Sequence, residues 1–463
     1  MANNNQVIGY LPDEKPSFWK LVLYAIQQVI VMFPATVAVA IITGFHISTT
    51  IFASGLATLC FVLVTKGQIP LYYGSSFSYV AAIAALMSSE ALSGYVLNEK
   101  IAIAQFGIVM SGFVSIAAGL IVNRFGRDSI EKVLPASITG PIAIVIGLTL
   151  AAVAVQDAAS ITVDALGTIR AAESQIALAK NMAWVVSLST LISTIVFSVY
   201  LKGFWRQIPI LLGPIVGCVV ALIIRAATGI DLFKMLPETA NTGFFALPIF
   251  TLPKPTWLAV AAIMPIAIAT IPESTAHIYQ LDIYVNDLAK KKGAKHYPLA
   301  EKLGLNLIGD GIGDIVAGFI GGPAGTNYGE NISAMAITRV FSVPVLVAAA
   351  LIAMVISCFT PLVNAIYSIP AAVIGGLEIY LFGAIAVQGV AIMMDRKVDM
   401  FSAKDIAVVA TILIIGIGGQ YAFGGNIPFF GIEVPCVAGA AIFGILLNLV
   451  LSLGQKKNNS PAA

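Results

Sequence analysis

Charge is scarce in this sequence. Asp, Glu, Lys and Arg make up only 10% of its 463 residues, whereas a soluble domain carries about a quarter. Hydrophobic residues make up 59%, and the mean hydropathy is +0.94. This composition excludes an ordinary soluble protein. The net charge of only +2 gives no reason to expect nucleic acid as a partner.

Cysteines and processing signals are also sparse. Cys60, Cys218, Cys358 and Cys436 lie far apart, without the spacing of a metal site or a disulfide framework. We therefore expect them to pack in the interior, and we expect neither a metal nor a cofactor. The first 17 residues are polar and lack an apolar stretch followed by a small-residue cleavage site, so no cleaved signal peptide is expected.

Apolar runs, in contrast, recur along the whole chain, each long enough to cross a hydrocarbon core of about 30 Å. They predict an all-α polytopic membrane protein of about 14 transmembrane segments, with no soluble domain between them. The polar stretches 157–180 and 283–302 are the longest predicted connections. The segments are expected near residues 18–43, 47–65, 71–88, 101–123, 135–156, 182–201, 207–228, 256–281, 303–320, 326–340, 342–366, 370–394, 405–420 and 434–453.

The distribution of positive charge predicts the orientation. If the N-terminus is cytoplasmic and the segments alternate, 19 of the 25 Lys and Arg residues fall on the cytoplasmic side and 6 outside. Cytoplasmic loops are normally the ones enriched in Lys and Arg. We therefore expect a multi-pass protein of the plasma (inner) membrane with both termini in the cytoplasm.

The third and tenth segments contain residues that break helices. Pro70 and the Gly74–Ser76 turn leave only about 12 helical residues in the third, too few to cross the bilayer. Glycines and Pro323 delay the tenth helix until Gly329. We expect short extended stretches there, which survive at membrane depth only if they line a cavity or pair internally. Broken helices in both halves of a transporter indicate its binding site.

Short sequence matches indicate an internal repeat. Pro34 corresponds to Pro272, Pro70 to Pro323, and Pro135 to Pro370, always in the same order. These matches indicate two copies of seven segments each. Because seven is odd, the second copy starts on the opposite side of the membrane, and the two copies have opposite orientations. The sequence therefore predicts two inverted repeats.

Acidic residues inside apolar segments are costly, so each needs a reason. Glu273 and His277 are four residues apart and share one helix face, either as a substrate carboxylate with a neighbouring imidazole or as a structural pair. Glu330 begins the short helix after Gly329, where it could bind substrate or cap the helix. Asp310, Asp314 and Glu378 are the remaining candidates, and Glu378 receives no role.

The two helix starts suit a planar base such as uracil, whose N–H groups alternate with carbonyls. Glu330 would accept from the N–H groups, while free backbone N–H groups would donate to the carbonyls. The start near Ser76 and Phe77 adds donors and an aromatic ring for stacking. Gln28, in the middle of the first segment, either binds substrate or joins helices.

Two functions of other classes remain open. Gly311–Asp314 contains the Gly-x-Gly-Asp motif of intramembrane aspartyl proteases, but the Tyr-Asp that usually carries their second aspartate is absent. An uncoupled channel is the other alternative. Broken helices together with buried carboxylates favour a carrier over both.

Four stretches resemble one known family. Residues 27–36, 66–70 with 74–77, 271–277 and 326–339 resemble the nucleobase–ascorbate transporters, and within them the bacterial uracil:proton symporters. The resemblance extends over about residues 15–455, and the stretch from Glu330 to Arg339 is its most specific part.

The resemblance implies a secondary active transporter, and not an enzyme, that imports uracil with a proton by alternating access; xanthine or another base is the alternative. A core domain would comprise 15–128 and 251–368, and a gate domain 129–250 and 369–455. The bilayer, uracil, protons and a second copy in a homodimer are the implied partners. The implied substrate-binding residues are Glu273, Glu330, Phe77, Gly329 and His277, those for proton coupling are Glu273, His277, Asp310 and Glu330, and those that could line the site are Gln28, Ser76, Asn331 and Ser333.

Three departures from the family pattern leave the preferred base open. Gln28 stands where histidine is common, Ser333 where glycine is usual, and Pro272 with 274–275 replaces other residues around Glu273. Glutamate at 330, in place of glutamine, resembles the uracil branch more than the xanthine branch.

Overall fold

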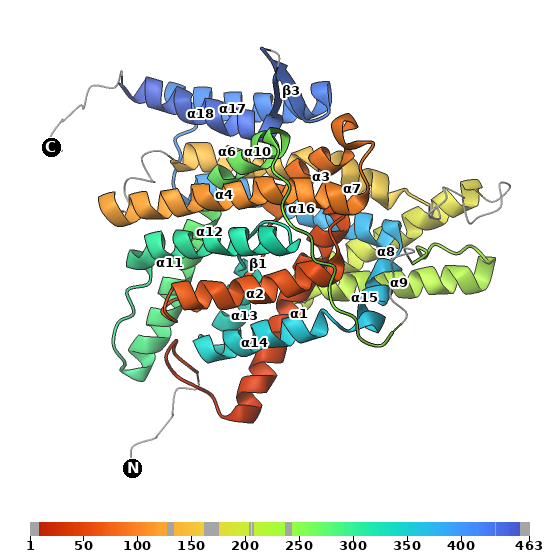
Figure 1. Ribbon diagram of the computed structural model, residues 1–463, viewed down its shortest axis with the longest axis horizontal. Helices are drawn as coiled ribbons and strands as arrows, with labels where there is room; N and C mark the ends of the chain where they lie inside the picture. Colours follow the sequence, from red (N-terminus) through yellow and green to blue (C-terminus); the bar gives the residue numbers. More distant parts are fainter. Residues whose placement is uncertain are drawn as a thin grey trace.

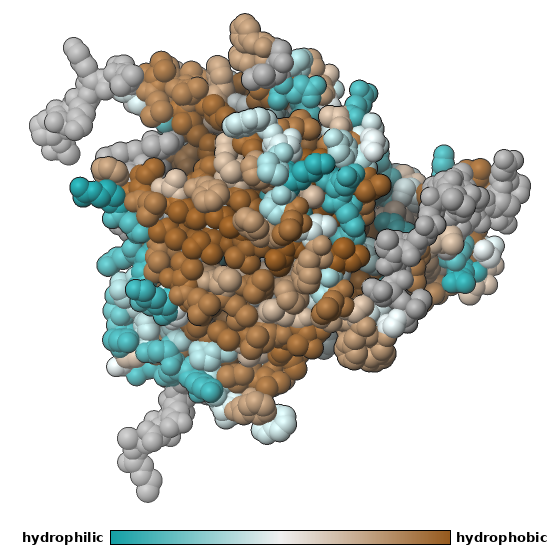
Figure 2. Space-filling model, in the orientation of Figure 1, coloured by the Kyte–Doolittle hydropathy of each residue, from teal (hydrophilic) through white to brown (hydrophobic). Residues whose placement is uncertain are grey.

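The computed structural model describes residues 9–126, 134–161, 176–202, 205, 208–236, 243–430 and 432–453. Within them, ten helices are long and apolar enough to cross a membrane, and three shorter helices are apolar. Figure 1 shows α2, α4, α12 and α14 running alongside one another, and Figure 2 shows apolar side chains over much of the visible face. The prediction of a helical protein with many membrane segments is therefore confirmed.

The elements follow the predicted order. The ten long helices are α1 (Phe18–Thr43), α2 (Ile47–Val64), α4 (Leu97–Phe125), α6 with α7 (Ala136–Thr149, Ala151–Ala158), α8 (Ile176–Tyr200), α9 (Pro209–Thr228), α10 with η5 and α11 (Trp257–Ile263, Met264–Ile266, Ala267–Lys292), η6 with α12 (Ala300–Lys302, Leu303–Ile320), α16 (Ala371–Asp395) and α17 (Ala403–Phe423). The shorter elements are β1 (Tyr73–Ser75), η1 with α3 (Phe77–Tyr79, Val80–Ser88), η2 (Glu90–Leu92), β2 (Gly325–Asn327), α13 (Gly329–Thr338), α14 (Val343–Ile356), α15 (Thr360–Tyr367), β3 (Asn426–Phe429), β4 (Ile432–Pro435) and α18 (Cys436–Leu453). The count of fourteen and the inverted repeats stay predictions.

Both long connections were predicted to contain more residues than they do, because helices extend into them. Helix α11 continues to Lys292, well into the stretch 283–302, and α8 begins at Ile176. Lys290–Lys292 occupy the last turn of α11, where positive charge is favourable beside the helix C-terminus. A helix can thus continue beyond the apolar run that predicts it.

A hairpin between α17 and α18 was not predicted. Gly424 and Gly425 have φ of 62° and 98°, so they end α17 and turn the chain. Asn426 then pairs with Pro435, and Phe429 with Ile432, in an antiparallel β3–β4 ladder. Residues 434–435 are consequently strand, and the last helix starts at Cys436.

Helices α4 and α12 approach each other through glycines. A Cβ on Gly112 would lie 2.5 Å from the carbonyl oxygen of Gly311, so only glycine fits at this crossing. Small residues at such crossings let membrane helices pack closely. Gly311 in the protease-like motif therefore has a packing role.

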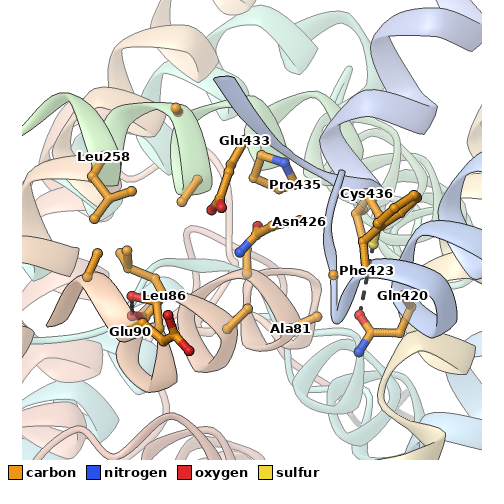
Figure 3. A pocket seen from close by; sticks show the side chains of 18 residues that line it. Ala81, Leu86, Glu90, Leu258, Gln420, Phe423, Asn426, Glu433, Pro435 and Cys436 are labelled. Atoms are coloured by element: carbon orange, nitrogen blue, oxygen red, sulfur yellow. Dashed lines mark hydrogen bonds between the residues drawn. The ribbon is translucent and has the colours of Figure 1, made fainter. Parts of the chain in front are cut away.

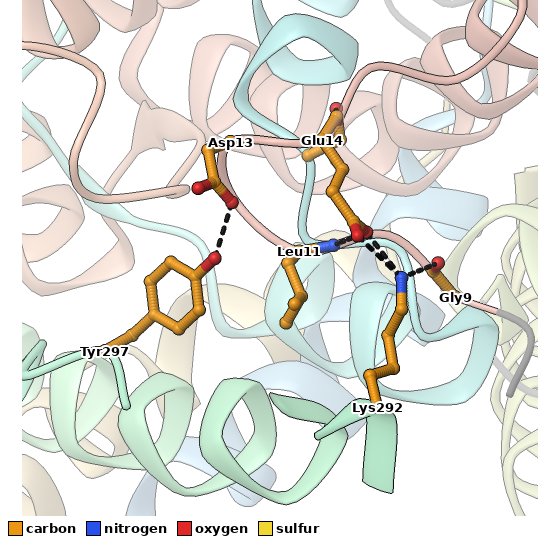
Figure 4. A network of polar contacts seen from close by, with 7 residues as sticks. Gly9, Leu11, Asp13, Glu14, Lys292 and Tyr297 are labelled. Atoms are coloured by element: carbon orange, nitrogen blue, oxygen red, sulfur yellow. Dashed lines mark hydrogen bonds and ion pairs between the residues drawn. The ribbon is translucent and has the colours of Figure 1, made fainter. Parts of the chain in front are cut away.

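An N-terminal segment, residues 9–15, ties two distant parts of the chain together. Tyr10 accepts a backbone hydrogen bond from Phe341 (2.8 Å) and donates one to Arg339 (2.8 Å). The Nζ of Lys292, at the end of α11, donates to both carboxylate oxygens of Glu14 (2.8 and 2.6 Å). Figure 4 shows the contact between Lys292 and Glu14. The segment thereby joins the end of α11 to the connection between α13 and α14.

Asp13 adds a contact of the same kind. The hydroxyl of Tyr297 donates to Asp13 Oδ1 (2.5 Å), and Lys295 lies 3.3 Å from Oδ2. The hydrogen bond from Tyr297 lowers the pKa of Asp13 below its ordinary value. A lowered pKa stabilises the fold above the pKa of the unfolded chain, and this contribution is lost as the pH falls through the folded pKa.

We expect Lys292→Met to loosen this segment slightly. The partly buried pair with Glu14 should contribute about 1 kcal/mol or less to the free energy of unfolding. Thermal unfolding of the purified protein in detergent measures the loss. Lys291→Met is the matched control, because Lys291 pairs with Asp287 on the exposed surface. Equal melting temperatures for Lys292→Met and Lys291→Met would show that the pair of Lys292 with Glu14 contributes no stability.

Candidate functional site

The two broken segments meet in the interior as a short antiparallel ladder. Tyr73 pairs with Asn327, Gly74 with Thr326, and Ser75 with Gly325. The extended stretches expected in these segments are therefore present, and they pair with each other. Each strand leads directly into a short helix, η1 with α3 on one side and α13 on the other. Two helix starts consequently lie next to one ladder.

Tyr328 holds this ladder against the first helix. Its hydroxyl donates to the carbonyl of Ser75 (3.0 Å) and shares a hydrogen bond with Thr36 of α1 (2.9 Å). The ring covers Gly74, where a Cβ would lie 2.3 Å from ring atoms. Glycine at 74 is therefore required for close packing as well as for breaking the helix.

Glu273 lies on α11 and faces the start of the third segment. The Oγ of Ser78 in η1 donates to Glu273 Oε2 (3.2 Å). Both residues are half-buried, so the carboxylate is not sealed in the protein interior. Pro272 precedes Glu273 inside the helix. A proline there removes one helical N–H, which leaves a backbone carbonyl of α11 without its usual donor.

Glu330 lies in the first turn of α13 and is also half-buried. The carboxylates of Glu330 and Glu273 are near enough to interact electrostatically. His277 lies beside the same helix start, since a Cβ on Gly329 would be 2.8 Å from its Nε2. Within the described residues, Nδ1 of this buried imidazole has no partner. The structure thus brings together Glu273, Glu330, His277 and Gly329, and their role in binding a substrate stays a prediction.

A buried polar network lies behind these groups. Ser274 donates to Asp310 Oδ2, and it accepts from Asn306 (2.8 Å) and Asn327 (3.0 Å). Asn327 also donates to Asp310 Oδ2 (3.3 Å). Asp310 is only 5% exposed. These hydrogen bonds hold α11, α12 and β2 relative to one another. Asp310 is thus more buried than the carboxylates of Glu273 and Glu330.

Asp314 anchors the ladder itself. Its Oδ1 accepts from the hydroxyl of Tyr73 (2.5 Å) and from the backbone N–H of Gly325 (2.8 Å). The carboxylate therefore joins α12 to both strands. A buried carboxylate needs such donors, because a charged or polar group left unpaired in the interior is destabilising.

We expect Tyr73→Phe to destabilise the protein by about 1–3 kcal/mol, because Asp314 would lose one of its two donors. Tyr72→Phe is the matched control. Both tyrosines are almost fully buried, but the Tyr72 hydroxyl makes no hydrogen bond to a described residue. Thermal unfolding should show a loss only for Tyr73→Phe. Equal melting temperatures would contradict the anchoring role of Asp314.

The residues expected to line the site occupy three kinds of position. Asn331 donates to the side chain of buried Gln28 (2.8 Å), so this pair joins α13 to α1. Ser76 caps η1 by accepting from the N–H of Ser78 (3.2 Å). Phe77 is half-buried at the same helix start. Ser333 is exposed, one turn along α13 from Glu330.

Sequence reasoning assigned no role to Ser78, Tyr328, Ser274 or Asn327. Ser78 directly follows the predicted helix start, and Tyr328 and Asn327 directly precede Gly329, so their proximity to the site could be predicted from the sequence. The residues that they contact could not be predicted in this way. Glu378 lies elsewhere, fully buried in α16, with neither carboxylate oxygen bonded to a described residue.

Comparison with known proteins places the chain among transporters. A sequence model of the Permease family matches residues 19–425. The uracil permease of Bacillus caldolyticus is 34% identical over 446 residues, covering 95% of this chain and 94% of the relative. That of Bacillus subtilis (strain 168) is 33% identical, covering 99% and 98%. A putative pyrimidine permease, RutG of Escherichia coli (strain K12), is 32% identical, covering 95% and 91%.

Solved structures share the fold at low sequence identity. The transmembrane domain of a cyanobacterial bicarbonate transporter, BicA, has a TM-score of 0.57 at 14% identity, covering 97% of this chain and all of that one. The murine anion transporter Slc26a9 has a TM-score of 0.65 at 13% identity, covering 95% and 69%. These similarities concern the fold alone.

The relatives are permeases and not enzymes, so the intramembrane protease alternative is rejected. The family match spans most of the chain, and the curated relatives exceed 30% identity over nearly its full length. This protein therefore belongs to the nucleobase–ascorbate transporter family of permeases.

Proposed function

We propose that this protein imports uracil or a closely related base together with a proton, by alternating access across the plasma membrane. The observation that carries the proposal is the meeting of two helix starts with two half-buried carboxylates, Glu273 and Glu330. The names of the relatives, uracil permeases and a pyrimidine permease, support a base as the substrate.

The chemistry of the site matches the edge of such a base. Glu273 and Glu330 accept from ring N–H groups. Phe77 and Gly329 are the first residues of their helices, and their backbone N–H groups donate to ring carbonyls. The ring of Phe77 packs on the face of the base. Uracil has both N–H and C=O groups on one edge, so its binding site needs both hydrogen-bond acceptors and donors. A purely apolar or purely acidic pocket would not provide both.

Proton coupling is assigned first to Glu273. Its half-buried position allows proton exchange with water, whereas Asp310 is held in a buried network. His277, one turn along α11, lies beside the base-binding helix start and contributes to the same step. Glu330, Asp310 and Asp314 are the alternative carriers. Lower external pH should speed uptake, because the proton is then a more abundant co-substrate.

The architecture proposed for transport has fourteen segments in two inverted repeats, with a core domain of 15–128 and 251–368. The gate domain comprises 129–250 and 369–455, and it moves relative to the core. Gate residues should supply few polar contacts to the base. We also propose cytoplasmic termini, in keeping with the 19 Lys and Arg residues on the predicted cytoplasmic side. A homodimer is proposed from the family resemblance alone.

Competition for uptake tests the substrate. Cells lacking their own base permeases, and expressing this chain, should accumulate labelled uracil, and unlabelled uracil should compete more strongly than xanthine. Glutamate at position 330 favours this order. Stronger competition by xanthine would replace uracil with a purine as the substrate, while uptake that no base reduces would contradict the proposal.

A further inference from the structure

A cavity of about 420 Å³ lies apart from the site just described, between α3 and α10 on one side and the β3–β4 hairpin on the other (Figure 3). Sites for small molecules commonly occupy about 300–1,000 Å³. Small side chains form one wall, namely Ala81, Ala82 and Ala85 of α3 with Ala261 and Ala262 of α10. Leu86 of α3 and Leu258 of α10 also line this side, so the wall is apolar.

The alanine wall continues the helix face that carries the central site. Ala81 and Ala85 follow Phe77 at intervals of four residues, and residues four apart share one helix face. Ser78, next to Phe77, donates to Glu273. Eight residues of helix span about 12 Å, so the cavity lies within two to three turns of the central carboxylates.

The rim carries polar side chains, whereas Phe423, Pro435, Cys436 and Val437 on the opposite wall are apolar. Figure 3 shows Glu433 and Asn426 extending from the hairpin toward α3 and α10, with Glu90 of η2 across from them. Among the described residues, no hydrogen bond or ion pair involves these three side chains. Their oxygen and nitrogen atoms are therefore free to bind a ligand. In the proposed topology this rim is on the outer side of the membrane.

We propose that this cavity is an outer subsite that holds a neutral, N–H-bearing heterocycle before it moves along α3 to the central site; the inference rests on the proposed import of a base. The ring would lie against the alanines. The Asn426 amide offers both a donor and an acceptor, and Glu433 and Glu90 accept from ring N–H groups. Two carboxylates at the rim repel anionic analogues of the base.

Two substitutions test the subsite. Ala85→Phe fills the cavity, and Asn426→Leu removes the amide at similar volume. In cells, at limiting uracil, we expect uptake per copy of transporter to fall about tenfold for Ala85→Phe and about fivefold for Asn426→Leu, the latter corresponding to one hydrogen bond. The equilibrium Kd of each purified variant for uracil should stay within about twofold of wild type, because the central site is unchanged. Ala410→Phe is the matched control, since Ala410 is exposed on α17 outside the cavity.

The outcomes separate the two proposals. Wild-type uptake in both variants would overturn the subsite, and so would a weakening of equilibrium binding parallel to the loss of uptake. Either result leaves the proposed function intact. If the unmodified protein neither binds nor imports uracil, the proposed function itself fails, and this is decided without the variants.

Discussion

Glu330→Gln should reduce the affinity for uracil by about 100-fold or more, because a carboxylate hydrogen bond to a ring N–H is among the stronger polar contacts. Glutamine has the same shape, but its amide can present an N–H group toward the N–H of the base. Glu330 begins α13 and is half-buried, so the neutral side chain should still fold in place. Equilibrium binding of labelled uracil to the purified variant measures the loss.

Glu301→Gln serves as the control for that measurement. Glu301 is an exposed glutamate in η6, outside the candidate site, so its substitution should leave the Kd unchanged. The thermal unfolding midpoint of Glu330→Gln should stay near wild type. Wild-type affinity in Glu330→Gln would show that Glu330 only caps its helix.

Glu273→Gln should abolish accumulation driven by a proton gradient, while exchange of internal for external base continues. The amide resembles the protonated carboxyl in shape and charge, so it fixes the neutral state. The contact with Ser78 is retained, since an amide oxygen accepts from a hydroxyl as a carboxylate does. A carrier fixed in this state can move its loaded form but cannot release a proton.

Counterflow in liposomes separates these two activities. Labelled uracil outside should exchange with unlabelled uracil inside, yet an inward proton gradient should produce no accumulation. Asp310→Asn provides the comparison, because Asp310 lies in the buried network behind Glu273. If Glu273→Gln accumulates uracil normally, while Asp310→Asn exchanges uracil but does not accumulate it, the proton belongs to Asp310.

The sequence predicted the spans well and the side-chain partners poorly. Apolar length fixed α1 and α12 almost to the residue, and prolines and glycines predicted the breaks before Phe77 and Gly329. These signals are local. The contacts of Ser274 with residues 306, 310 and 327 depend on three elements that meet only after packing, so no spacing along one helix reveals them.

The hairpin and α11 show a second limit of the same kind. Hydropathy predicts which segment lies in the hydrocarbon, but it does not predict where the helix ends. The end of α11 was therefore placed too early, because the helix extends to Lys292. The strands β3 and β4 are stabilised by pairing with each other, which a single short segment does not indicate. The end of α11 contacts the N-terminal segment, and the hairpin forms one wall of the cavity beside α3 and α10.

The most direct test of the central claim is a joint measurement of proton influx and labelled uracil uptake in liposomes containing the purified protein. The account predicts that uracil entry is accompanied by proton entry, that an inward proton gradient drives accumulation, and that a protonophore abolishes it. Uracil entry without proton movement, or accumulation that survives the protonophore, would contradict proton-coupled import by this protein.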